Sequence, residues 1–358
     1  MRRALALARK GFGRTSPNPA VGAVIVKNGR VIGEGYHRKA GMAHAEIEAI
    51  HAVRGGKGTV RGATLYVTLE PCCHWGRTPP CTDALISSGI KRVVVGMKDP
   101  NPLVSGKGIK ILKDAGIDVA AGVLDAECRS VNEAYIKYIT AKRPFVTLKL
   151  ASTLDGRIAA CTGDSKWITG VKSRRLVHRM RSLTDAVMVG GSTVERDDPA
   201  LTVRLVKGKD PVRAVVDSSL KMPLGSRVFG NGRPGGLIIF TTVKASADKI
   251  RKARERGASV VIVPASKEGV SLKGVLKELG RRGIINLLVE GGGRLAASFL
   301  KGGLVDKMAL FLSPVILGGD GAPSIGRLGI KKVSKGLRLR DMTERRVGRD
   351  ILIEGYLR

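Results

Sequence analysis

The alternation of short apolar runs with amphipathic runs constrains the fold of this chain more than any other feature. Near the N-terminus two apolar runs flank Asn28-Gly29, a pair that favours a tight β-hairpin. Further on, the strand-like run ATLYVTLE (63–70) follows AHAEIEAIHAV (43–53), which has helical periodicity. Strands that alternate with helices in this way predict a mixed α/β sandwich with helices on both faces of a sheet.

A second α/β unit is predicted after the middle of the chain. Residues 126–141 have the pattern of one helix, and Pro144 ends it because the residue before a proline avoids the helical region. From Phe145 the strand alternation begins again and continues through more apolar runs than in the first half, which predicts a larger sheet. We therefore expect two domains, at 1–143 and 144–358, each of ordinary size.

The charge of the chain points to anionic ligands but does not choose among them. There are 63 Lys and Arg residues against 30 Asp and Glu residues, a formal net charge of +33. Such a field attracts nucleic acid, phosphorylated metabolites and dinucleotides alike, and it also fits a general basic bias of solvated surfaces.

The apolar runs and the cysteines together predict the cellular compartment of the protein. The first apolar run is broken at Arg9-Lys10, too early for a secretory signal, and no run approaches the ~18 residues of a membrane span. The five cysteines are not spaced as a disulfide framework. We therefore expect a cytoplasmic protein, in which clustered cysteines indicate metal binding or chemistry.

Three of the five cysteines fall within the loop EPCCHWGRTPPC (70–81). Together with His44, Cys72 and Cys81 would give three ligands suited to zinc, the number found where catalytic zinc keeps one position for water. Glu46, two residues after the histidine, could reach that water without binding the metal and shuttle a proton to leaving ammonia. The HxE…PC pattern is typical of zinc nucleobase deaminases.

The spacing of the cysteines departs from that class. Nucleic-acid and nucleoside deaminases mostly use PCxxC, whereas here the next cysteine after the adjacent pair Cys72-Cys73 is Cys81. We prefer Cys72 to Cys73 as the ligand because it follows the proline. The loop between the ligands would then lie beside the metal, where it can touch a substrate. A structural zinc site or a buried cysteine cluster is the alternative interpretation.

Four segments together carry a family resemblance: TSPNPAVGAVIV, HAEIEAI, TLYVTLEPCCHWGRTPPCTDALI and KLASTLDGRIA…GDSKWITG. The chain resembles the bifunctional pyrimidine deaminase/reductase family of riboflavin biosynthesis over its whole length. The resemblance implies a cytidine-deaminase-like α/β/α sandwich followed by a dihydrofolate-reductase-like α/β domain. It also implies zinc-dependent deamination of 2,5-diamino-6-(5-phosphoribosylamino)pyrimidin-4-one, then NADPH-dependent reduction of the ribosyl group to give 5-amino-6-(5-phosphoribitylamino)uracil.

In the first domain the resemblance assigns roles to seven residues. It assigns zinc ligation to His44, Cys72 and Cys81, proton transfer to Glu46, and substrate contact to Asn18, His74 and Arg77.

In the second domain, a glycine run and a lysine can each be interpreted either as part of a binding site or as ordinary structure. The run in NLLVEGGGRLAASFL ends a strand and opens a helix, whose free N–H groups suit a phosphate, although a tight turn would look the same. It lacks the full dinucleotide fingerprint, so we do not expect a Rossmann domain. Lys149 lies on the strand face opposite Leu148 and Leu150, so it either extends to solvent at an edge or points into a site. Trp167 either fills the core or meets a ligand.

Here the resemblance implies two groups of contacts. The residues themselves show no obvious proton donor for the reduction. Arg181 and Arg204 suit a phosphate because a guanidinium offers a bidentate fork. Substrate contacts are expected at Lys149, Ser165, Arg181, Leu201, Arg204 and Glu290, and NADPH contacts at Ala151, Trp167, Thr193, Asp197, Ser218, Gly292 and Gly293.

Other functions remain as alternatives with distinct signatures. A nucleic-acid (tRNA) deaminase with an accessory domain predicts a PCxxC site and basic strands interleaved with aromatic residues, and the sequence has neither. A zinc-stabilised binding module needs a fourth ligand, which Cys73 or His74 could offer, but Glu46 would then have no role. A chain in which one domain had lost its activity is a further alternative, but the motif residues of both domains are present. We expect a small phosphorylated pyrimidine as substrate and a homo-oligomer, without membrane or nucleic-acid partners.

Overall fold

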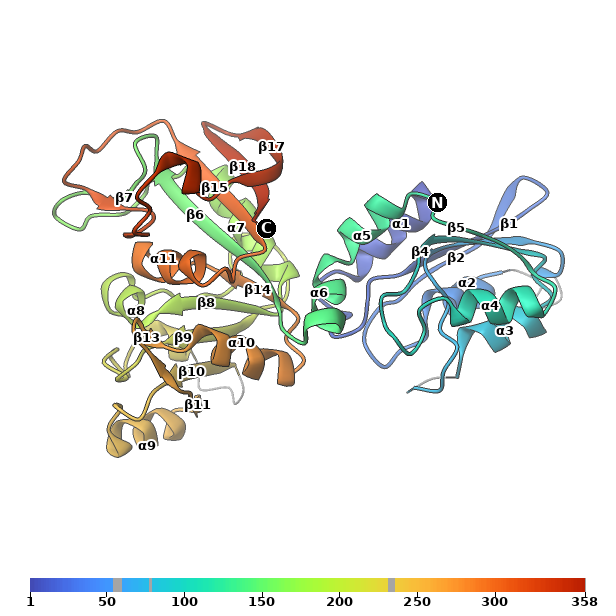
Figure 1. Ribbon diagram of the computed structural model, residues 1–358, viewed down its shortest axis with the longest axis horizontal. Coiled ribbons are helices and arrows are strands. Elements are labelled where there is room, and N and C mark those ends of the chain that lie inside the picture. The colour runs from blue at the N-terminus through green and yellow to red at the C-terminus, as the bar shows by residue number, and fades with distance from the viewer. Residues whose placement is uncertain (54–59, 77–78, 231–235, 358) are drawn as a thin grey trace. The chain divides into compact units, whose positions relative to one another are not determined.

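The computed structural model describes residues 1–53, 60–76, 79–230 and 236–357 (Figure 1). The chain divides into two compact units, Met1–Lys142 and Arg143–Arg358. The division lies one residue before the boundary expected from Pro144. Both units combine β-sheets with helices, so the predicted α/β class is confirmed for each.

The N-terminal unit is built on a five-stranded sheet with the strand order β2-β1-β3-β4-β5. Asn28 and Gly29 adopt positive φ angles of 50° and 73°, so the predicted turn joins β1 to β2. β1 pairs antiparallel with β2 and β3, whereas β3, β4 and β5 are parallel. The strands are β1 Gly22–Lys27, β2 Arg30–Tyr36, β3 Thr64–Leu69, β4 Arg92–Met97 and β5 Asp118–Ala121.

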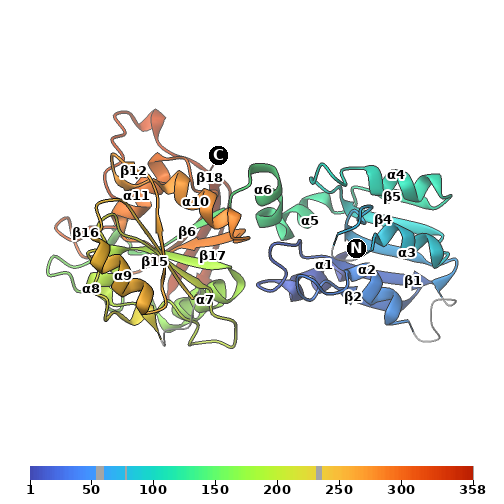
Figure 2. The same ribbon diagram turned by 90° about the horizontal axis from the view of Figure 1, so that it is seen from below.

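Helices cover both faces of this sheet, as the sequence pattern predicted. α1 and α5 pack together on one face, and α2, α3 and α4 follow one another on the other (Figures 1 and 2). The helices are α1 Arg2–Ala8, α2 Ala45–His51, α3 Cys81–Ser87, α4 Lys107–Asp114, α5 Asp125–Val131 and α6 Glu133–Ala141, with a short 3₁₀ turn at Arg9–Gly11.

The prediction of a single helix at 126–141 was wrong, because this segment forms two helices, α5 and α6, separated at Asn132. The buried Asn132 side chain accepts a hydrogen bond from the Ala20 N–H at 2.9 Å and donates one to the Ala20 carbonyl at 3.1 Å. These bonds tie the helix break to a segment 112 positions earlier. Helical periodicity carries no information about such a distant partner.

The C-terminal unit is built on a nine-stranded sheet with the order β11-β10-β9-β8-β14-β6-β15-β18-β17. Its core is parallel, and β18 and β17 add an antiparallel edge (Figure 1). The strands of this sheet are β6 Phe145–Thr153, β8 Ala186–Gly190, β9 Val212–Val216, β10 Leu237–Thr241, β11 Ser259–Ile262, β14 Asn286–Val289, β15 Lys307–Ser313, β17 Leu339–Val347 and β18 Asp350–Leu357. Two short ribbons pair β7 Arg157–Ala159 with β16 Ala322–Pro323, and β12 Ala265–Ser266 with β13 Gly269–Val270.

Helices pack on both faces of the large sheet. α10 and α11 share one apolar core with it, while α8 and α9 share another and α7 a third. Leu148 and Leu150 of β6 belong to the core with α10 and α11, and Ala151 packs in the core with α7. Lys149 therefore faces the α7 side. The helices are α7 Val171–Leu183, α8 Gly191–Asp197, α9 Ala247–Glu255, α10 Leu272–Arg281 and α11 Gly293–Lys301, with 3₁₀ turns at Arg227–Phe229 and Val333–Lys335.

β17 was not predicted. It is the outermost strand of the sheet, and the seven residues between its two ends are all exposed. A strand with no buried face has no apolar alternation for a sequence pattern to detect. In the described part of the chain, no helix has the length and apolar character that crossing a membrane requires.

The position of α2 depends on Gly35 in β2, and this generates a prediction. A Cβ at Gly35 would lie 2.4 Å from both the Ala45 carbonyl oxygen and the Ala49 nitrogen. Because these are backbone atoms, Gly35→Ala must push α2 off the sheet. We expect a loss of about 1–3 kcal/mol from the free energy of unfolding of the N-terminal unit. Calorimetry should show a thermal transition lowered by several degrees.

The control for this experiment is Gly225→Ala, since a Cβ there meets nothing within 4 Å. That variant should unfold like the parent protein. An unchanged transition in Gly35→Ala would show that α2 can move at no cost, which contradicts the packing argument.

Candidate active sites

The three predicted zinc ligands converge in the N-terminal unit. His44 immediately precedes α2, Cys81 is the first residue of α3, and Cys72 follows the end of β3. Their ligand atoms lie within 4.8 Å of one another, and His44 Nδ1 is 3.2 Å from Cys81 Sγ and 3.5 Å from Cys72 Sγ. Two sulfurs around one imidazole nitrogen are a donor set that fits zinc.

Of the adjacent cysteines, Cys72 and not Cys73 joins this cluster. The Cys81 backbone N–H donates to Cys72 Sγ at 3.4 Å, and the Thr82 N–H donates to the Cys72 carbonyl at 3.2 Å. Hydrogen bonds from Cys81 and His44 lower the pKa of the Cys72 thiol to about 4. Cys72 therefore favours the thiolate, which is the form that binds metal.

Glu46 lies in the first turn of α2, beside the ligand cluster. It is buried and lines the same cavity as His44 and Cys72. Burial, helped by the negative charge of Cys72, raises the pKa of Glu46 to about 7. The carboxyl group is thus next to the cluster without being one of its three ligands.

The cavity at this cluster has a volume of about 420 Å³, and Asn18 and His74 line it. The Asn18 amide nitrogen lies 3.1 Å from His37 Nε2, and His37 Nδ1 lies 3.0 Å from the Ala43 carbonyl oxygen. Since a carbonyl only accepts, Nδ1 carries the proton and Nε2 accepts from Asn18. His37 thus orients Asn18, and His74 Nδ1 is buried with no hydrogen-bond partner among the described residues. Arg77 lies outside the described residues.

Sequence reasoning missed three residues that line this cavity: Asp99, Asn101 and Tyr135. The buried Asp99 carboxylate accepts hydrogen bonds from the Tyr135 hydroxyl at 3.0 Å and from the Asn101 N–H at 2.8 Å. Burial raises the pKa of Asp99. Asp99 follows β4 and Tyr135 belongs to α6, so only the tertiary fold brings them to the cavity, and no local motif marks them.

Most residues predicted for the C-terminal unit meet in a cavity of about 720 Å³. They come from β6, α7, α8 and the connections that follow β7, α8 and β14. The predicted residues that line it are Lys149, Ala151, Ser165, Trp167, Arg181, Thr193, Asp197, Leu201, Arg204, Glu290 and Gly292.

A buried ion pair lies in this cavity. Arg181 Nε donates to Glu290 Oε1 at 2.6 Å and Nη2 donates to Oε2 at 3.0 Å, while Lys149 Nζ is 3.7 Å from Oε2. Burial alone would raise the pKa of Glu290, but the charges of Arg181 and Lys149 hold it at about 2. Arg181 Nη1 also donates to the Thr202 carbonyl at 3.1 Å. Three of the five N–H directions of this guanidinium are therefore already used within the protein.

Trp167 does not fill the core, so that interpretation was wrong. Its side chain is 66% exposed, and its ring lies under the Arg174 guanidinium at 4.4 Å. An exposed indole at the rim of a cavity is available to a planar ligand.

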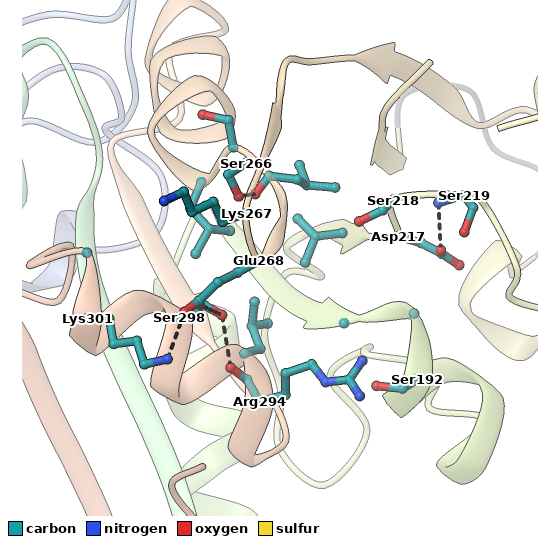
Figure 3. A pocket seen from close by; sticks show the side chains of 18 of the residues that line it. Ser192, Asp217, Ser218, Ser219, Ser266, Lys267, Glu268, Arg294, Ser298 and Lys301 are labelled. Atoms are coloured by element: carbon teal, nitrogen blue, oxygen red, sulfur yellow. Dashed lines mark hydrogen bonds and ion pairs between the residues drawn. The ribbon is translucent and has the colours of Figure 1, made fainter. Parts of the chain in front are cut away.

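Two residues expected to contact the cofactor are not in the 720 Å³ cavity. A Cβ at Gly293 would lie 2.4 Å from the Pro323 carbonyl oxygen, so close backbone packing already requires a glycine there. Ser218 lines a different cavity, of about 630 Å³, together with Ser192 and Arg294 (Figure 3). Ser218 lies apart from the other expected cofactor contacts because it follows β9, two strands away from β14 in the sheet, and its contact with the cofactor stays a prediction.

The first turn of α8 and the N-terminal end of α11, with the glycine before it, contribute to both cavities. Gly191 and Ser192 of α8 line the 630 Å³ cavity, whereas Thr193 of the same turn lines the 720 Å³ cavity. Likewise Arg294 of α11 lines the former, and Gly292, which precedes α11, lines the latter. The two hollows therefore share a wall made of helix N-termini.

Family models match both halves of the chain. Residues 1–97 match the cytidine and deoxycytidylate deaminase zinc-binding region, and residues 144–353 match the RibD C-terminal domain. The riboflavin biosynthesis protein RibD of Aquifex aeolicus is 49% identical over 354 residues, which cover 99% of this chain and 96% of that protein. The chain belongs to the RibD family.

Solved structures of RibD proteins match this chain over its whole length. RibD of Acinetobacter baumannii has 36% identity and a TM-score of 0.89, with 100% of this chain and 97% of that one covered. A diaminohydroxyphosphoribosylaminopyrimidine deaminase/5-amino-6-(5-phosphoribosylamino)uracil reductase of Thermotoga maritima has 42% identity, a TM-score of 0.87 and the same coverage. The match extends through the reductase half, which favours the bifunctional interpretation over a nucleic-acid deaminase with an accessory domain.

The geometry of the cluster predicts how metal binding depends on each cysteine. Cys72→Ser and Cys81→Ser should each lose most bound zinc, because each removes one of two sulfurs at the imidazole. Cys73→Ser, the matched control at the adjacent position, should keep about one zinc per chain. Elemental analysis of the purified variants measures this directly. Zinc loss in Cys73→Ser with retention in Cys72→Ser would reverse the ligand assignment.

Proposed function

We propose that this chain performs two successive steps of riboflavin biosynthesis. The N-terminal unit deaminates 2,5-diamino-6-(5-phosphoribosylamino)pyrimidin-4-one, and the C-terminal unit reduces the ribosyl group of the product with NADPH. The observation that supports this most directly is that each unit has a cavity lined by the side chains that its proposed reaction requires. One has a cluster of three candidate zinc ligands beside the buried Glu46 carboxyl group, and the other has a buried ion pair beside the start of a helix.

In the deaminase unit, His44, Cys72 and Cys81 would hold zinc, which supplies the Lewis acidity that activates a water molecule. Glu46 takes the proton that the water loses and passes it to the amino nitrogen on C2 of the pyrimidine. The C2–N bond then breaks, ammonia leaves, and the water oxygen becomes the new carbonyl oxygen. Asn18, fixed by His37, and His74 are placed to bind the ring or its phosphoribosyl arm.

In the reductase unit, NADPH supplies the hydride. Opening of the ribosylamine breaks the bond between C1′ and the ring oxygen, and the resulting imine carbon accepts the hydride while its nitrogen takes a proton. Glu290, kept ionised by Arg181 and Lys149, gives the cavity one fixed negative charge. Arg204 is exposed to the cavity, which suits it to the substrate phosphate better than Arg181.

We extend the NADPH site across the wall that the two cavities share. Ser165 lies with the substrate in this proposal, whereas Ala151, Trp167, Thr193, Asp197 and Gly292 face the nicotinamide half. The 630 Å³ cavity with Ser218 and Arg294 would then receive the adenosine end and its 2′-phosphate (Figure 3). A helix N-terminus and an arginine are both favourable to phosphate groups.

The remaining proposals concern the location, the ligand and the oligomeric state of the enzyme. A cytoplasmic location suits a zinc site built on thiolates, because reducing conditions keep the cysteines free. A small phosphorylated pyrimidine as the ligand suits the charge of +33. We also propose a homo-oligomer, which gel filtration with light scattering would test.

One experiment tests both activities. Glu46→Gln preserves side-chain size but cannot shuttle a proton, so ammonia release should fall at least ~10²-fold while zinc is retained. The same variant should oxidise NADPH at the parent rate when the deaminated intermediate is supplied, because every residue proposed for reduction lies in the other unit. Near-normal ammonia release with full zinc would remove Glu46 from the mechanism. Failure of the parent protein to oxidise NADPH with the intermediate would refute the reductase function.

A second prediction concerns the choice between NADPH and NADH. Arg294→Gln should raise KM for NADPH by ~10–100-fold, the loss expected for one charge-assisted contact. KM for NADH should change little, since that cofactor has no 2′-phosphate. Steady-state reduction of the supplied intermediate measures both constants. An equal increase for the two cofactors would place Arg294 at the diphosphate instead.

A further inference from the structure

One side chain in the reductase cavity has no part in the scheme above: His178 of α7. Positions 174, 178 and 181 are four and three residues apart, so they lie on one face of the helix. Arg174, His178 and Arg181 all line the 720 Å³ cavity. The imidazole is only 7% exposed, and the accessible part of its surface is therefore in the cavity.

The tautomer of His178 follows from one hydrogen bond. The backbone N–H of Arg204 donates to His178 Nδ1 at 3.0 Å. A nitrogen that accepts from an amide carries no proton, so in the neutral ring the proton is on Nε2. No described residue accepts a hydrogen bond from Nε2, yet this atom is not sealed from solvent. His178 thus offers the cavity an N–H donor with nothing in the protein to receive it.

The surroundings keep this imidazole neutral. Burial lowers the pKa of His178, and the nearby charges of Arg181, Arg204 and Lys149 lower it further, against a smaller opposing effect of Glu290. Protonation of Nδ1 would also break the bond from the Arg204 N–H. A ring fixed in this state donates a hydrogen bond from Nε2 but does not supply a proton to the reaction.

The same histidine bonds to the loop that carries Arg204. This loop is tied to α7 at two points: Arg204 N–H donates to His178, and Arg181 Nη1 donates to the Thr202 carbonyl. The Arg204 side chain remains exposed to the cavity, 3.4 Å from the Thr202 hydroxyl. The Arg204 charge is thereby close enough to the imidazole to lower the pKa of His178, and both side chains line the same cavity.

We propose that His178 is a substrate-positioning residue whose Nε2–H donates to the phosphoryl group of the phosphoribosyl arm, alongside Arg204. The proposal rests on the reductase function given above. The phosphate belongs at this side of the cavity because the exposed Arg204 forms no ion pair with any described residue, whereas Arg181 and Lys149 are already paired with Glu290. A neutral donor adds a directional contact there without adding to the repulsion among Arg181, Arg204 and Lys149.

Two isosteric variants separate the two nitrogens of the ring. In His178→Asn the amide oxygen can take the place of Nδ1 and accept from the Arg204 N–H, but the donor at Nε2 is lost. In His178→Gln the longer side chain can place an amide N–H where Nε2 was, but the acceptor for Arg204 is lost. Arg179→Gln is the matched control, because Arg179 is on the same helix, is exposed and does not line the cavity.

The assay is NADPH oxidation with the deaminated intermediate, before and after a phosphatase has removed its phosphate. His178→Asn should raise KM for the phosphorylated intermediate ~10-fold or more, with kcat and KM for NADPH little changed. With the dephosphorylated intermediate, parent and His178→Asn should be equal. His178→Gln should recover most of the affinity for the phosphorylated form, and Arg179→Gln should match the parent throughout.

Several results would overturn the proposal. An equal loss with both forms of the intermediate would mean that His178 acts on the loop or the fold and not on the phosphate. If His178→Asn lost no affinity for the phosphorylated intermediate, or if His178→Gln lost more than His178→Asn, only Nδ1 would contribute to substrate binding. Failure of the parent protein to oxidise NADPH would instead refute the reductase function itself, so the two failures are distinguishable.

Discussion

A carboxylate taken out of water must find compensation or take up a proton, and the way this protein meets that requirement determines both sites. Glu70 accepts hydrogen bonds from three backbone N–H groups, those of Asp99, Gly106 and Ile109. It thereby holds the segment after β4 and the start of α4 in place. Glu290 is compensated instead by two cations, Arg181 and Lys149.

Glu46 is also buried, and among the described residues no Lys or Arg forms an ion pair with it. Its pKa is raised to about 7, whereas that of Glu290 is held at about 2. The same functional group is therefore suited to proton exchange near neutral pH in one unit and to a fixed negative charge in the other. Both groups are buried, but Arg181 of α7 and Lys149 of β6 lower the pKa of Glu290, whereas at Glu46 burial dominates and the charge of Cys72 adds to it. These contrasting environments are what allow one chain to host hydrolytic and reductive chemistry.

The parts of the molecule that the sequence predicted well are those whose signal is local. The turn at Asn28-Gly29, the face of β6 that carries Lys149 and the start of α3 at Cys81 each depend on residues a few positions apart. The features it missed depend on distant partners: Asn132 bonds to Ala20, and Asp99 bonds to Tyr135.

His178 and Ser218 show the same limit in the C-terminal unit. Nothing near His178 in the sequence shows that its Nδ1 will accept from Arg204, 26 positions later. Ser218 ends a strand as expected, but only the order of strands in the sheet decides which cavity it lines. Local patterns thus predicted elements and the three residues of the His44–Cys72–Cys81 cluster, whereas the assignment of side chains to particular cavities required the fold.

Helix starts connect these local and distant effects. In the N-terminal unit the cluster is assembled from the residue before α2 and the first residue of α3, and in the C-terminal unit both cavities reach the first turn of α8 and the N-terminal end of α11. Free N–H groups and the helix dipole favour negative charge at such positions, whether a thiolate such as Cys72, which accepts from the Cys81 N–H, or a phosphate. Because a helix start is a local signal, residues next to one could be proposed from sequence. Roles for mid-helix residues such as His178 and Arg181 could be proposed only once their partners in the fold were known.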